Sequence, residues 1–125
     1  SMVEIVTETH SDVNAFTEKT FKPLFIGKPF VILGAQHIHK TLTKYGFVLY
    51  DEIFNYDFDN NSSLSARTES ILNNLIKLKK VKYSSIYNKI YEKLLYNKKR
   101  LFDIIKNDNT YPLNHIPKEI LLSFY

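Results

Sequence analysis

The chain has 125 residues, of which 44% are hydrophobic and 24% charged, and it carries a formal net charge of +4. These values are ordinary for a globular protein, and they predict one domain, residues 1–125, with a single hydrophobic core. Because the sequence has no cysteine, it excludes a disulfide framework and any thiolate metal site.

No apolar run approaches the roughly 20 residues that a membrane-spanning helix needs, and the N-terminus lacks a signal-peptide pattern. We therefore expect no membrane span and a cytoplasmic location. Residues 1–2 are typical of a remnant left by tag removal, so we expect the chain to be part of a longer protein.

The first predicted element is a strand over the β-branched residues 3–6. This strand would bring Glu8 to its carboxyl end, where open α/β sheets bind their ligands. Residues 11–14 are turn formers and predict a loop after the strand.

A helix is predicted next, with Thr17 as its N-cap and Gly27 after its last residue. Pro23 would then fall at the sixth position of that helix, where it removes a backbone hydrogen bond. We therefore expect either a bent helix or a later start that is capped by Thr20.

The continuous apolar run over residues 30–33 predicts a buried parallel strand that ends at Gly34, where a ligand would approach the backbone. Residues 37–45 have helical spacing, and residues 47–50 predict a third strand. This alternation predicts an α/β fold, a Rossmann-like three-layer domain with a small parallel sheet.

Two longer helices are predicted over residues 62–80 and 85–106, followed by a short C-terminal helix in the tail. The first of these helices carries Arg67 in its early turns. An arginine could clamp a phosphate there, but we expect this side chain to face solvent.

A charged cluster surrounds the start of the first helix and forms the candidate site. Lys19 and the free N–H groups near Thr17 would suit a phosphate, and Glu18 would accept hydrogen bonds from sugar hydroxyls. The alternative is an ordinary helix start, in which Glu18 complements the helix dipole and Lys19 is solvated.

The same segment resembles the donor-binding signature of the alpha-fucosyltransferases, E-N-S-x-x-x-D-Y-V-T-E-K. Glu8 matches the opening glutamate, and residues 17–19 match the closing T-E-K with the same spacing. The aromatic residue expected beside the nucleotide base falls at Phe16. Residues 26–34 resemble the glycine and strand that follow this signature in the family.

The resemblance implies the C-terminal, donor-binding half of a GT-B glycosyltransferase. Lys19 would neutralise the diphosphate of a nucleotide sugar such as GDP-fucose, and Glu18 would contact the ribose. Glu8 would orient either the transferred sugar or the motif loop. The catalytic base and the site for a glycan or protein acceptor would lie in a missing half, so this domain alone should turn over nothing. No further cofactor is implied.

Asp57 and Asp59 form a D-x-D pair that could hold a divalent metal in a GT-A-like site. We favour loop and cap roles for this pair and expect no metal. His37 and His39 would diverge by about 200° on a helix, so we also expect no zinc.

A different class of function is an interaction module that binds protein or RNA through the basic helices. Lysine clusters and tyrosines alternate over residues 77–100. We expect these lysines to form a solvated helix face, with the tyrosines at the edge of the buried stripe, and therefore no bound nucleic acid.

Overall fold

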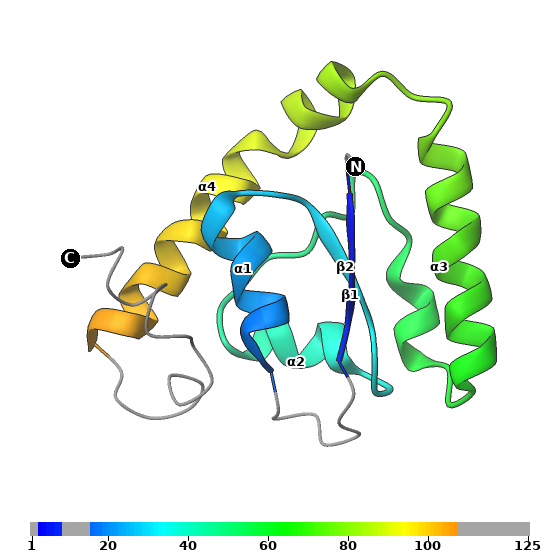
Figure 1. Cartoon of the computed structure of the whole chain (residues 1–125), viewed down its shortest axis with the longest axis horizontal. Coiled ribbons are helices and arrows are strands. Elements are labelled where there is room, and N and C mark those ends of the chain that lie inside the picture. Colours follow the sequence, from blue (N-terminus) through cyan, green and yellow to red (C-terminus); the bar gives the residue numbers. More distant parts are fainter. Residues whose placement is uncertain (1–2, 9–15, 108–125) are drawn as a thin grey trace.

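The computed structural model describes residues 3–8 and 16–107 (Figure 1). The elements along the chain are β1 (Glu4–Thr7), α1 (Glu18–Ile26), β2 (Phe30–Leu33), α2 (Ile38–Lys44), the 3-10 helix η1 (Tyr56–Asn60), α3 (Leu64–Leu78) and α4 (Tyr83–Asn107). The predicted loop over residues 11–14 and the predicted C-terminal helix lie outside the described residues.

The two strands pair in parallel, with Ile5 opposite Val31 and Val6 opposite Ile32. Helix α1 makes the crossover between them, so the first half of the chain contains one β-α-β unit. The predicted α/β class with a small parallel sheet is confirmed. The sheet that the described residues form is mostly covered by helices, with α1 and α4 to one side and α3 to the other (Figure 1).

Helix α1 begins at Glu18 and keeps Pro23 inside it, which decides between the two starts that the sequence allowed. The Thr17 hydroxyl caps the helix by accepting a hydrogen bond from the Lys19 N–H at 3.2 Å. Gly27 ends the helix in the left-handed conformation, with φ of 73°, as its position predicted.

The prediction of a third strand over residues 47–50 is wrong, because no described residue pairs with this segment as a strand. The side-chain amide of Asn97 takes the place of a neighbouring strand. Its Oδ1 accepts from the Val48 N–H at 2.8 Å, and its Nδ2 donates to the Val48 carbonyl at 2.9 Å.

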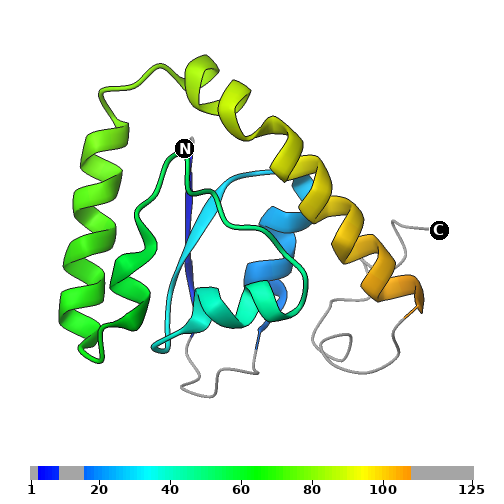
Figure 2. The ribbon, with the colours of Figure 1, turned by 180° about the vertical axis from the view of Figure 1, so that it is seen from behind.

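The same segment passes close to α4 (Figure 2), and two basic side chains of that helix hold it. Lys93 donates to the Leu49 carbonyl at 2.7 Å, and Arg100 Nε donates to the Tyr45 carbonyl at 2.7 Å. A Cβ atom at Gly46 would lie 2.6 Å from Arg100 Nε, and Gly46 has a φ of +92°. Glycine is therefore required where Arg100 crosses the chain.

The core joins both halves of the chain. Its members with the lowest exposure are aliphatic and aromatic side chains from α1, β2, α2 and α4: Phe21, Leu24, Val31, Ile32, Leu42, Ile86, Ile90 and Leu101. Within the described residues, no helix is both long enough and apolar enough to cross a membrane.

Replacing Asn97 by alanine should lower the free energy of unfolding by about 2–4 kcal/mol, because the Val48 N–H and carbonyl then lose their partner near the core. Urea unfolding followed by circular dichroism measures this loss. Asn88→Ala, an exposed change on the same helix, is the matched control and should change stability by less than about 0.5 kcal/mol. Equal effects of the two variants would show that the hydrogen bonds between Asn97 and Val48 contribute nothing to stability.

Candidate functional site

The site predicted from the sequence lies at the carboxyl end of the parallel strand pair. Glu8 follows β1, and its backbone N–H donates to the Leu33 carbonyl at 3.1 Å, which extends the pairing by one residue. The Glu8 side chain is buried, at 5% exposure, and lies at the start of α1.

The Glu8 carboxylate accepts three hydrogen bonds from two threonines. The N–H and hydroxyl of Thr17 donate to it at 2.9 and 2.8 Å, and the buried Thr20 hydroxyl donates at 2.5 Å. A carboxylate is favourable at a helix N-terminus, because the dipole and the free N–H groups stabilise negative charge. The protein therefore fills this anion-binding position with its own side chain.

This geometry changes the role expected for the first turn of α1. The Thr17 N–H, which we expected to help hold a phosphate, is bonded to Glu8, and the Lys19 N–H is bonded to the Thr17 hydroxyl. Of the two roles implied for Glu8, orientation of the motif loop is the one for which the contacts are present.

Glu18 and Lys19 lie in the first turn of α1 with exposed side chains. Neither side chain forms a salt bridge with any residue in the described ranges. The structure thus brings Glu8 and Thr17 into direct contact and leaves the two charges that follow them available to solvent.

Phe16 is not available to stack on a nucleotide base. The ring is 1% exposed and packs edge-on against Tyr45, with 6.1 Å between the ring centroids. The close approach expected at Gly34 is likewise internal, because a Cβ atom there would lie 3.0 Å from Ile38 Cδ1 and 3.4 Å from Glu8 Cβ.

Arg67 is buried, so the prediction that it faces solvent is wrong. Its two terminal nitrogens donate to the Asn61 carbonyl at 2.7 Å and to the Gly34 carbonyl at 2.8 Å. This guanidinium ties α3 to the carboxyl end of β2. The burial of Arg67 could have been predicted from the sequence. Arg67 lies four residues before Ile71, so on a helix the two residues share one face.

Asp59 caps α2 and pairs with a buried histidine. One carboxylate oxygen lies 2.8 Å from His39 Nδ1 and accepts from the His39 N–H at 3.1 Å, and the other accepts from the Lys40 N–H at 3.0 Å. No group of three or more potential metal-binding side chains occurs in the described part of the chain.

The His39 ring has a partner at each nitrogen. Nε2 accepts from the Ile32 N–H of β2 at 3.0 Å, which places the ring proton on Nδ1, where it is donated to Asp59. Since both ring nitrogens are occupied by the protein, this buried pair holds the edge of β2 and is not arranged to take a proton from a substrate.

Burial would raise the pKa of Asp59, but the hydrogen bond from the His39 ring and those from two backbone N–H groups lower it below its ordinary value of 3.8.

Comparison of the chain with protein-family models, with curated proteins and with solved structures finds no match.

Because the pKa of Asp59 is lowered in the folded state, its contribution to stability is present above pH 4 and is lost as the pH falls through the lowered pKa. Asp59→Asn should cost about 1–3 kcal/mol at pH 7 and should lose less stability than the parent between pH 5 and pH 2. Urea unfolding at each pH measures both effects. Asp57→Asn, at an exposed position, is the control and should keep the parent's pH dependence.

Glu8→Gln should lower the free energy of unfolding by about 1–3 kcal/mol, because an amide replaces one of the two carboxylate oxygens that face three donors. Thermal or urea unfolding measures the loss. The exposed Glu18→Gln makes the same chemical change one position into α1 and should cost about 0.5 kcal/mol at most. If Glu8→Gln is as stable as the parent, Glu8 does not order the start of α1.

Proposed function

We propose that this chain is the donor-binding half of a GT-B glycosyltransferase, a Rossmann-like three-layer domain that recognises a nucleotide-diphosphate sugar for transfer to an acceptor hydroxyl. One observation carries the proposal. Within the β-α-β unit, Glu8 fixes the start of α1 beside the carboxyl end of β1, and Lys19 and Glu18 are exposed at that start. Nucleotides bind at this end of open parallel sheets.

Each of the three charged side chains has one role. Lys19 neutralises the diphosphate as a mobile point charge, and Glu18 accepts hydrogen bonds from the ribose. Glu8 is a positioning residue, because its carboxylate is saturated by Thr17 and Thr20 and holds the turn that carries the other two. The nucleotide therefore binds through side chains, because the Thr17 N–H is already bonded.

Transfer also needs a general base within hydrogen-bond reach of the acceptor hydroxyl. Under this proposal the base and the site for a glycan or protein acceptor belong to a second half that this chain does not contain. The isolated domain then binds its donor weakly and is inactive. Its contribution to catalysis in the whole enzyme is electrostatic, through stabilisation of the leaving diphosphate by Lys19.

Titration of the domain with GDP, GDP-fucose, UDP and ADP, followed by amide chemical shifts, tests the proposal. We expect at least one nucleotide to shift the amides of Thr17, Glu18 and Lys19. Lys19→Glu should weaken that binding about tenfold, whereas Lys22→Glu, an exposed change of equal charge in the same helix, should change it by less than about twofold. Absence of shifts in this turn with all four compounds would refute the donor site.

A further inference from the structure

Most basic residues of the chain lie in one segment of its second half. Residues 77–106, the end of α3 with α4, contain ten Lys or Arg and two Asp or Glu, whereas the rest of the chain contains seven and eleven. The modest net charge of +4 therefore combines a segment of +8 with a remainder of −4. A segment of this charge attracts polyanions.

Tyrosines lie along the same helix. Tyr87 lies at the edge of the buried stripe, as we expected, whereas Tyr83 and Tyr91 are more exposed than that expectation. Tyr83, Tyr87 and Tyr91 are each one turn apart, and their successive ring centroids are 5.9 and 5.4 Å apart. Tyr83 is 51% exposed and Tyr91 is 45% exposed. They form a ladder of rings along α4, in which Tyr87 packs against the core and Tyr83 and Tyr91 are half-exposed.

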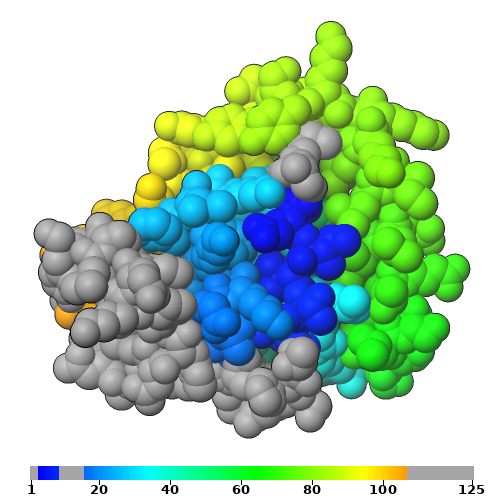
Figure 3. Space-filling view, in the orientation of Figure 1, coloured from blue at the N-terminus to red at the C-terminus, as the bar shows by residue number. Residues whose placement is uncertain are grey.

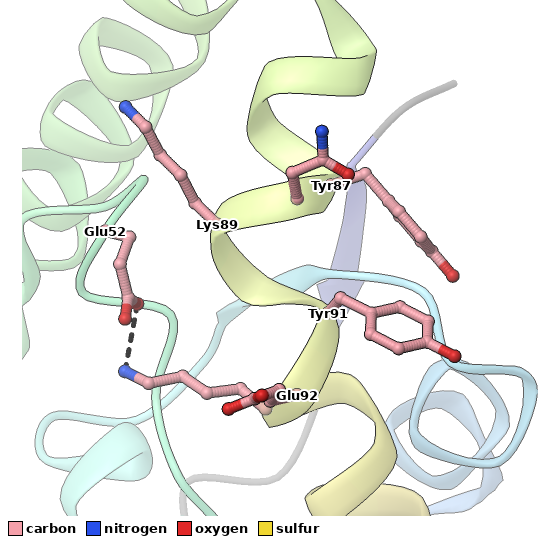
Figure 4. A pocket seen from close by; sticks show the side chains of 7 residues that line it. Glu52, Tyr87, Lys89, Tyr91 and Glu92 are labelled. Atoms are coloured by element: carbon pink, nitrogen blue, oxygen red, sulfur yellow. Dashed lines mark ion pairs between the residues drawn. The ribbon is translucent and has the colours of Figure 1, made fainter.

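A groove of about 530 Å³ runs beside this ladder (Figure 4). Its lining includes two tyrosines, two lysines and two glutamates: Tyr87, Tyr91, Lys89, Lys93, Glu52 and Glu92. The two rings project from one side of α4, and Lys89 projects from the other. Lys93 is bound to Glu52 at 2.9 Å, whereas Lys89 has no salt bridge within the described residues. The first half of α4 lies at the surface of the molecule (Figure 3).

We propose that the exposed first half of α4, with the tyrosine ladder on one side and Lys89 on the other, binds a single-stranded nucleic acid. The lysines neutralise phosphates, and the exposed tyrosine rings stack on unpaired bases, which are the two requirements of single-strand binding. A duplex satisfies only the first, because its bases are already stacked. A lipid surface fits less well, since the aliphatic stripe of α4, including Ile90 and Leu101, is buried in the core and cannot enter a bilayer.

Fluorescence anisotropy with the full chain and a labelled oligouridylate of about 16 nucleotides tests the proposal. We expect binding whose affinity falls steeply with salt, and weaker binding to a duplex of the same length. The double variant Lys80→Glu, Lys89→Glu should weaken binding at least about tenfold and flatten the salt dependence. Lys22→Glu, Lys44→Glu makes the same change of charge on α1 and α2 and should have an effect of less than about threefold.

The aromatic contribution is tested separately. Tyr91→Ala should weaken binding about tenfold without changing the salt dependence, whereas Tyr91→Phe, which keeps the ring, should bind like the parent. Because Tyr91 is 45% exposed, all three proteins should unfold at similar temperatures. Equal affinity for single strand and duplex with no loss in Tyr91→Ala overturns the proposal. So does binding only to vesicles that contain phosphatidylserine, or no binding at low salt.

Discussion

The contact between the Glu8 carboxylate and the start of α1 is the interaction on which the candidate site depends. Three hydrogen bonds join the end of β1 to Thr17 and Thr20, and the donors lie nine or twelve residues after Glu8 in the sequence. A buried carboxylate costs desolvation free energy unless such donors surround it, and here the first turn of α1 supplies them. The exposed charges of Glu18 and Lys19 are held at the rim of the sheet as a result.

Elsewhere, side chains of helices take the place of strands. Asn97 bonds both backbone groups of Val48, His39 accepts from Ile32 at the edge of β2, and Arg67 binds the Gly34 carbonyl. Each of these polar side chains is itself buried, at 1%, 1% and 8% exposure. Backbone groups near a core need partners, and in this fold polar side chains from the helices satisfy groups that a wider sheet would pair with its own strands.

Local patterns were sufficient to predict the elements whose causes are local. The apolar run of β2, the Thr17 cap and the Gly27 end each depend on a few neighbouring residues, and all three lie where the sequence placed them. The errors concern contacts between distant residues. Nothing near residues 47–50 indicates that Asn97 will replace a strand. The sequence favoured a cap role for Asp59, but it gives no local sign that the capped helix is α2, about twenty residues earlier in the chain.

The separation between Val48 and Asn97 also bears on how the chain folds. These residues lie 49 positions apart, so the middle of the chain cannot complete its backbone hydrogen bonds before α4 exists. During synthesis on the ribosome, the backbone groups of Val48 would have no partner until Asn97 had emerged. Such long-range closure slows folding and makes the order of synthesis matter, because the segment is open to wrong pairing during that interval.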